Sequence, residues 1–214
     1  MPQNPAISGH EAKGEIAWYG RDMAAPARPA TYQDVLDAPE HRVAEVIDGE
    51  LYLQPRPRKP HAAAASALGD ELGPPFRRGK GGPGGWIILD EPEIHVGKDI
   101  IVPDLAGWRR ERMPKLVDDE AFFSLPPDWV CEVLSRRTAA LDRTKKLPIY
   151  ARERVSHAWL VDPVARTLEG YALEDGGWKL RGTWAGDDPI RVEPFDAIEL
   201  ELSALWADVE LLEK

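Results

Sequence analysis

A glutamate interrupts an apolar segment of the chain. Glu132 lies within the run W-V-C-E-V-L at residues 129–134. A short run that is apolar on both faces is typical of a central strand of a sheet. Two-residue alternation places Glu132 on one face of this strand together with Val130 and Leu134. A carboxylate buried in this way is costly unless it is paired or binds a cation. The run therefore predicts a central strand whose acidic side chain needs a partner.

A second acid follows another apolar run. Asp104 comes directly after Pro103 and the β-branched residues 100–102, and the pattern predicts a strand over Ile100–Ala106. Carboxylate oxygens are the ligands that Mg²⁺ prefers in proteins, with water and phosphate oxygens completing its shell. Asp104 and Glu132 on neighbouring strands would supply such a site, and they predict a cation there.

The helix expected after the Glu132 strand carries basic residues. Thr138 is predicted to cap a helix that runs to about Arg152, with Pro148 breaking or kinking its last turns. Asp142, Lys146 and Tyr150 recur every four residues, so they share one face. Two acids and a lysine are the groups that metal-assisted phosphodiester hydrolysis uses.

The other elements form one mixed α/β domain over residues 30–214, after a flexible arm at residues 1–29. Asp48-Gly49 between two apolar arms predicts a hairpin over Val43–Leu53, and Glu45 lies on its first arm. The remaining expected segments are a short helix at 31–36, a helix at 61–72, a basic glycine-rich loop at 73–85, and strands at 86–89, 93–96, 157–161, 166–173, 178–184 and 198–202.

Composition limits the function. The net charge of −10 argues against a module that binds nucleic acid over a wide basic surface, so nucleic-acid contacts must be local. The single cysteine fits a reducing cytoplasm, and it excludes an internal disulfide or a cysteine metal cluster. No apolar run approaches the roughly 18 residues of a membrane span, so we expect no membrane contact and a cytoplasmic location. The candidates for local phosphate contacts are Arg136, Arg137, Arg143 and Lys145.

The motifs in their order resemble a known family. They are E-V-I-D-G-E-L, Pro60-His61, Pro103-Asp104, E-V-L-S, D-x-x-x-K-x-x-x-Y and H-A-W-L-V-D-P. Together they resemble the Uma-two family of restriction-type endonucleases, in the PD-(D/E)XK nuclease superfamily, over residues 31–206. The resemblance implies a restriction-endonuclease-like fold, with a mixed sheet flanked by helices and a β-rich C-terminal part. It also implies a Mg²⁺-dependent (or Mn²⁺-dependent) endonuclease acting on DNA.

The resemblance also implies roles for individual residues. Asp104 and Glu132 match the metal ligands, and Glu45 matches a third acid. The superfamily places its lysine two residues after the glutamate, where this chain has Leu134, and Lys146 on the following helix matches the relocated lysine. His61 matches the histidine of the Pro-His pair, for which no role is implied.

Other interpretations stay open at this point. The chain could be a catalytically silent nuclease-like domain used for binding or assembly, or a hydrolase of small phosphoesters. Asp104 could cap a turn, Glu132 could pair with an arginine, and the helix lysines could form a solvated face. Trp108, beside three arginines, could stack on a base. A homodimer is expected because two active sites would face the two DNA strands.

Overall fold

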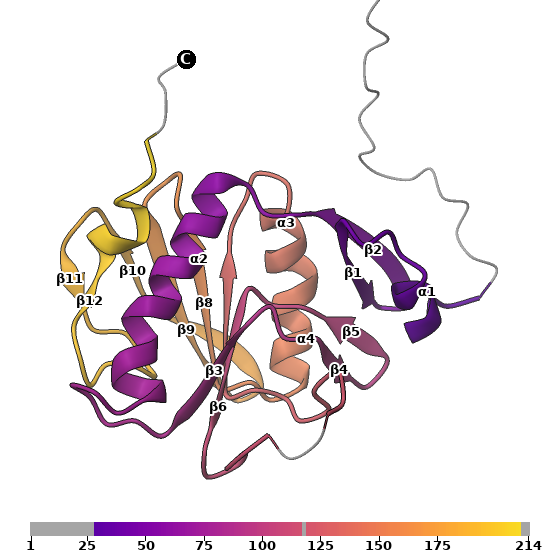
Figure 1. The fold of residues 1–214 in the computed structure, drawn as a ribbon, viewed down its shortest axis with the longest axis horizontal. Coiled ribbons are helices and arrows are strands. Elements are labelled where there is room, and N and C mark those ends of the chain that lie inside the picture. Colours follow the sequence, from indigo (N-terminus) through magenta and orange to yellow (C-terminus); the bar gives the residue numbers. More distant parts are fainter. Residues whose placement is uncertain (1–27, 117–118, 211–214) are drawn as a thin grey trace, which may run out of the picture.

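The computed structural model describes residues 28–116 and 119–210, and two main sheets dominate this part of the chain (Figure 1). The large sheet contains β3 (Trp86–Asp90), β6 (Leu105–Arg109), β7 (Trp129–Val133), β8 (His157–Asp162), β9 (Thr167–Glu174) and β10 (Gly177–Ala185). The small sheet contains β1 (Arg42–Ile47), β2 (Glu50–Pro55), β4 (Ile94–Val96) and β5 (Asp99–Ile101). A short pair, β11 (Pro189–Ile190) and β12 (Leu200–Glu201), follows. The predicted arm at residues 1–29 lies almost entirely outside the described residues.

The helical segments are short except for one. They are α1 (Tyr32–Leu36), α2 (Lys59–Leu72), the π-helical turn η1 (Gly73–Arg77), α3 (Ala139–Leu141), the π-helical turn η2 (Asp142–Lys146), α4 (Leu147–Arg152) and the 3₁₀ turn η3 (Leu202–Trp206). The predicted loop at 73–85 therefore begins with a helical turn, η1, in which Phe76 is buried. None of the helices described here has the length and apolar character needed to cross a bilayer.

The Glu132 strand is central, as predicted. The strand order of the large sheet is β10-β9-β8-β7-β6-β3, so β7 has neighbours on both sides. It pairs in parallel with β8 and antiparallel with β6. The chain reaches β8 from β7 through α3, η2 and α4, a helical crossover of the kind that parallel strands require. The mixed sheet with helices on both faces confirms the predicted fold class (Figure 1).

Two cores cover the two faces of the large sheet. On one face α2 and the C-terminal residues pack against Trp129, Cys131 and Val133. On the other face α4 and the small sheet pack against Val130 and Leu134. The two-residue alternation read from the sequence is therefore confirmed. It places the side chain of Glu132 on the face covered by the helical crossover and the small sheet.

The hairpin is confirmed, whereas one predicted strand is not continuous. Asp48 and Gly49 have φ angles of 53° and 81°, the left-handed values that a tight primed turn requires. The strand predicted over Ile100–Ala106 breaks after Ile101, and the chain passes from β5 in the small sheet to β6 in the large one. Pro103 cannot donate a ladder hydrogen bond, which fits its place at the break.

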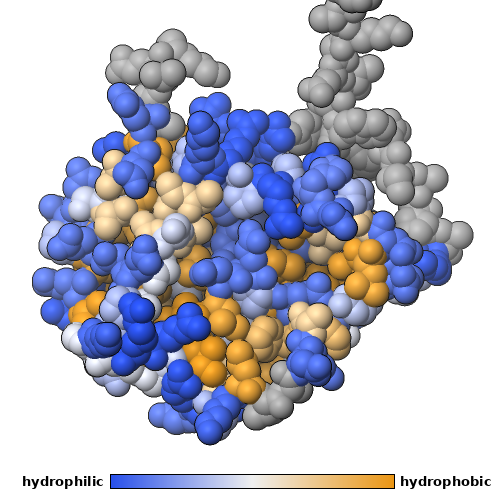
Figure 2. Space-filling view, in the orientation of Figure 1, coloured by the Kyte–Doolittle hydropathy of each residue, from blue (hydrophilic) through white to orange (hydrophobic). Residues whose placement is uncertain are grey.

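The face of the molecule shown in Figure 2 is mostly hydrophilic, with smaller apolar areas between polar ones. The exposed large hydrophobic residues of the described chain are scattered over several elements and connections; they are Leu36, Leu53, Leu116, Leu125, Val164 and Leu180. Single exposed residues of this kind are normal for a folded domain. These residues therefore form no single large apolar surface.

Candidate functional site

A buried ammonium group lies at the centre of the polar cluster. The Nζ atom of Lys146 lies 2.9 Å from Oε1 and 3.0 Å from Oε2 of Glu132, and 3.1 Å from Oε1 of Glu45. It also donates to the backbone carbonyl of Val102 at 3.0 Å. Lys146 and Glu132 are each 2% exposed and Glu45 is fully buried. Since an ammonium buried without partners is very costly, these four contacts allow Lys146 to stay charged.

The small sheet supplies Glu45 in a fixed orientation. Its Oε1 accepts a hydrogen bond from the backbone N–H of Val102 at 2.9 Å, and its Oε2 accepts one from Nε2 of Gln54 at 2.7 Å. Glu45 pairs with Tyr52 across the hairpin, so Gln54 lies two residues further along the same face. The sequence analysis did not identify Gln54. The Asp48-Gly49 turn implies the strand register that places Gln54 on the same face as Glu45, so it could have been predicted.

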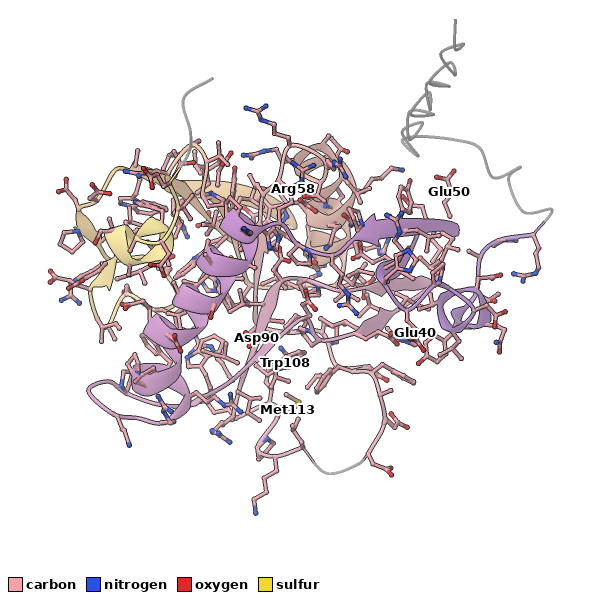
Figure 3. All side chains as sticks on the ribbon, turned by 45° about the horizontal axis from the view of Figure 1, so that its top comes forward. Glu40, Glu50, Arg58, Asp90, Trp108 and Met113 are labelled. Atoms are coloured by element: carbon pink, nitrogen blue, oxygen red, sulfur yellow. The ribbon has the colours of Figure 1, made fainter. Side chains whose placement is uncertain are left out.

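Asp104 lies at the break between β5 and β6. Its Oδ2 accepts a hydrogen bond from the backbone N–H of Val133 at 2.6 Å, which ties the start of β6 to the end of β7. Its Oδ1 lies 3.1 Å from Nε2 of His61, in the first turn of α2. Figure 3 labels Arg58, which directly precedes α2, and Asp90, which ends β3. Unlike Lys146, Asp104 and His61 keep side-chain exposures of 17% and 12%, so they form the solvent side of the cluster.

The helix face read from the sequence points into this cluster. Asp142, Lys146 and Tyr150 are all buried, and the hydroxyl of Tyr150 donates to Oε1 of Glu132. Asp142 and Lys146 begin and end the π-helical turn η2, and the N–H of Leu147 bonds to the carbonyl of Asp142. Such wide turns are frequent at functional sites. The turn ends two residues before Pro148, which lies in the first turn of α4, where a missing N–H costs no helical hydrogen bond, so the helix continues through it.

The cluster contains more negative than positive charge. Burial raises the pKa of the Glu132 carboxyl well above its usual range; Lys146 opposes this rise, while Asp142, Asp104 and Glu45 add to it. Burial likewise raises the pKa of Asp142 to about 6, against the opposing charge of Lys146. The pKa of Lys146 is also raised: burial opposes its charge, but the surrounding carboxylates outweigh that cost.

His61 responds to the same negative charge. Burial works against its protonated form, but the hydrogen bond and charge of Asp104 outweigh burial and raise the pKa of His61. Its Nδ1 is buried without a hydrogen-bond partner. The structure therefore places His61 at the acidic cluster through one ring nitrogen, a contact that the sequence pattern did not assign.

The donor set fits a hard divalent cation. Carboxylate oxygens from Asp104 and Glu132 are suitable Mg²⁺ ligands, and one or two protein carboxylates are usual for Mg²⁺ in nucleotide chemistry. Burial is the main cause of the raised pKa values of Glu132 and Asp142, and the neighbouring acids add to it. Within residues 28–116 and 119–210, no three side chains of the metal-ligand types converge in a ready-made metal site. Solvent and substrate oxygens would thus have to complete the shell.

A family model matches most of the chain. Residues 29–204 match the family model described as "Uma2: Putative restriction endonuclease". The chain belongs to this family. Membership places the chain in a nuclease family of the restriction-endonuclease type, as the sequence motifs indicated. No protein with a curated description matches the chain.

A solved structure shares the fold. It is described as a "putative nuclease belonging to DUF820 from Anabaena variabilis" and has 22% sequence identity and a TM-score of 0.65. The match covers 84% of this chain and 98% of that one. At this identity the similarity shows the fold alone. The roles of individual residues of this chain rest on the contacts that they make.

The departure from the superfamily pattern has a structural explanation. Leu134, at the position of the superfamily's lysine, is 4% exposed and belongs to the core under the helical crossover. A leucine there packs against apolar neighbours, while Lys146 reaches Glu132 from η2. The ammonium and the carboxylate are thus brought together from two elements rather than from one strand.

Several candidates for phosphate contacts are already engaged or lie apart. Arg143 forms a two-pronged ion pair with Glu169, with contacts of 2.8 and 2.5 Å. Lys145 lies 3.3 Å from Oδ2 of Asp48 at the hairpin turn. Arg136 and Arg137 are exposed in the connection after β7.

The base-stacking interpretation of Trp108 is wrong. Its side chain is fully buried, and its Nε1 donates to the carbonyl of Leu125 at 2.8 Å. Adjacent residues of a strand point to opposite faces, so the exposure of Arg109 implies nothing about Trp108. Trp108 is part of the core.

Proposed function

We propose that the chain is a Mg²⁺-dependent endonuclease that hydrolyses phosphodiester bonds in DNA. The observation that carries the proposal is the buried contact of Lys146 with Glu132 and Glu45, beside the Asp104 carboxylate, in a chain of a nuclease family. A structural ion pair would need one lysine and one acid. Here two acids, Glu132 and Glu45, contact one lysine, and Asp104 and Asp142 act on the charge of Glu132 as further acids, which favours a role with a cation.

In this proposal Asp104 and Glu132 hold the cation, and Glu45 completes the acidic set. The cation would neutralise charge on the phosphate and lower the pKa of a bound water. Lys146 holds Glu132 through both carboxylate oxygens and supplies a positive charge toward the reacting phosphate. Tyr150 fixes Glu132 by a further hydrogen bond. The phosphate would approach from the side of Asp104 and His61, the partly exposed members of the cluster.

DNA is the proposed substrate because restriction endonucleases, the type named in the family's description, cut DNA. The net charge of −10 requires that contacts with the duplex be concentrated on small basic areas. We further propose a homodimer, since a two-fold pair of chains would present one site to each strand.

The competing function is binding without cleavage. The near-complete burial of Lys146 and Glu132 favours it, because a phosphate must reach groups that are closed off in this conformation. A cut would therefore require the cluster to open when substrate and cation bind.

Cleavage of supercoiled plasmid tests the proposal. The wild-type protein should nick plasmid in Mg²⁺ or Mn²⁺ and be inactive in EDTA, and Glu132→Gln should be inactive in either. A small phosphodiester should be cut far more slowly than plasmid. Intact plasmid at every metal concentration, from protein that still binds DNA, would establish the silent binding domain instead. Equal rates on the two substrates would point to a small-phosphoester hydrolase.

A further inference from the structure

A basic patch lies at the end of the large sheet opposite the acidic cluster. We define the β3–β6 patch as the basic residues of segments 77–85 and 109–112; they are Arg77, Arg78, Lys80, Arg109, Arg110 and Arg112. Asp104 directly precedes β6 and Arg109 ends it. Five residues of strand span about 17 Å, so the patch is too far away to touch a phosphate bound at Asp104.

Backbone contacts hold the two segments of the patch side by side. Trp86 at the start of β3 pairs with Arg109 at the end of β6, and the N–H of Arg110 donates to the carbonyl of Gly85 at 2.9 Å. The guanidinium of Arg109 lies 4.6 Å above the ring of Trp86. Within the glycine-rich segment, the N–H of Lys80 donates to the carbonyl of Pro74. These contacts make one surface from residues far apart in sequence.

The patch keeps its positive charge. Its two segments contain six basic residues and one acidic residue, Glu111. Arg112 pairs with the buried Asp128 at 2.8 Å. Among the described residues no carboxylate lies within ion-pair distance of Arg78, Lys80 or Arg110. Other arginines of this acidic chain are neutralised, as Arg143 is by Glu169.

The patch is also exposed and polar. Arg77, Arg78 and Lys80 are exposed, while the apolar residues of the same segments, Phe76 and Trp86, are buried at 1% and 3%. In the lower part of Figure 2, hydrophilic side chains lie beside an area of apolar ones. In Figure 3, Trp108 and Met113 are labelled on either side of the 109–112 segment. A surface that inserts into lipid also presents apolar side chains beside basic ones, so lipid binding is one outcome that the experiment distinguishes.

We infer that the β3–β6 patch binds the phosphodiester backbone of a nucleic acid outside the active site. Five of its six basic residues are arginines, whose planar forks match phosphate oxygens in pairs. A Cβ atom at Gly81 or Gly85 would meet no neighbouring atom within 4 Å, so the backbone there is open to close approach. The patch would add binding that does not depend on the base sequence. The inference relies on the proposed function only for the identity of the polyanion.

Equilibrium binding in EDTA tests this inference without any cleavage. The probe is a fluorescent duplex of about 20 base pairs, titrated from about 50 to 200 mM salt. The test variant is Arg78→Gln/Lys80→Gln/Arg110→Gln. The control is Arg166→Gln/Lys179→Gln/Arg191→Gln, which removes the same charge from exposed residues elsewhere. The test variant should bind at least about tenfold more weakly, with a salt slope lower by about two to three units. The control should stay within about twofold of wild type.

Two results would overturn the inference. Equal losses in the test and control variants would mean that only net charge matters. A test variant that keeps its duplex affinity but loses binding to phosphatidylserine vesicles would assign the patch to a lipid surface. Failure of the endonuclease proposal is separable, because a protein that never cuts plasmid can still show the patch-dependent binding in EDTA.

Discussion

The ammonium of Lys146 contacts both carboxylate oxygens of Glu132, although the two residues lie 14 positions apart on different elements. β7 supplies the acid, and the π-helical turn of the crossover supplies the lysine. The PD-(D/E)XK pattern puts both groups on one strand. Here Leu134 occupies that strand position, and Lys146 reaches Glu132 from the helical crossover. The ammonium and the carboxylate therefore come from two different elements.

Lys146 and its neighbour Lys145 should differ sharply. Lys146→Gln should lower the plasmid cleavage rate by about 10²-fold or more, the scale of losing one charge-stabilising group. Lys145→Gln should mainly weaken DNA binding, because Lys145 lies on the outer side near Asp48. The measurement is the single-turnover cleavage rate for each variant, with duplex affinity measured in parallel.

Loss of folding must be separated from loss of chemistry in this pair. Removing Lys146 leaves two buried carboxylates without their cation, which costs about 3 kcal/mol or more of stability. Rates are therefore compared at a temperature where melting curves show both variants folded. Equal effects of the two substitutions would show that the lysine of the site has been misassigned.

Divalent cations should stabilise the fold. A ligand that binds the folded state alone raises stability by mass action, by about 2.7 kcal/mol at a hundred times its dissociation constant. The melting temperature of wild type should therefore rise with Mg²⁺ or Mn²⁺. Asp104→Asn and Glu132→Gln should abolish the rise, while Asp90→Asn, an exposed acid at the end of β3, should keep it. A wild-type melting temperature that changes with neither metal would contradict the proposed metal site.

Asp142 should make the protein more stable in mild acid. Its carboxyl has a pKa of about 6 in the fold, against 3.8 as its ordinary value. Between these pH values the folded protein keeps a proton that the unfolded chain has lost, so the contribution of Asp142 to stability falls as pH rises from about 4 to 6. At pH 7 Asp142→Asn should raise the free energy of unfolding by up to about 3 kcal/mol.

Urea unfolding of wild type and Asp142→Asn at several pH values measures this effect. The difference between the two proteins should be large at pH 7 and vanish near pH 4. Glu169→Gln is a useful comparison, because Arg143 lowers the pKa of Glu169 and the sign of its effect is opposite. A wild type that loses as much stability as the variant on going from pH 4 to 7 would contradict the assignment.

The proposed homodimer can be measured directly. Light scattering at micromolar concentration should give twice the mass of the chain, which is 23.8 kDa. Addition of a two-fold symmetric duplex should not change the number of chains per complex. A monomer at all concentrations, with or without duplex, would remove the proposal that paired sites cut the two strands.

Local patterns predicted the parts of the fold that depend on local physics. The run around Glu132 identified the central strand because both faces of such a strand must be apolar. Asp48-Gly49 identified the hairpin because few residues adopt positive φ. The helical spacing of Asp142, Lys146 and Tyr150 placed all three on one buried face, even though a π-helical turn lies between the first two.

Features that depend on distant partners were not predictable in this way. Val102 donates to Glu45 and accepts from Lys146, which lie 57 and 44 positions away, so the apolar run 100–106 gives no sign of its break. Arg143 and its ion-pair partner Glu169 are 26 positions apart in the sequence. The spacing of basic residues along the helix therefore does not show that Arg143 is paired. Sequence spacing finds faces and turns, whereas partners of this kind come from the assembled tertiary structure.

The break between β5 and β6 means that the cluster is assembled from two sheets. Glu45 lies on β1 of the small sheet, whereas Glu132 lies on β7 of the large sheet and Asp104 directly precedes β6. The short stretch from Val102 to Asp104 connects the two sheets, and Lys146 contacts both sides of it. The ammonium therefore has all of its partners only when both sheets and the helical crossover are in place, and neither sheet alone contains a complete site.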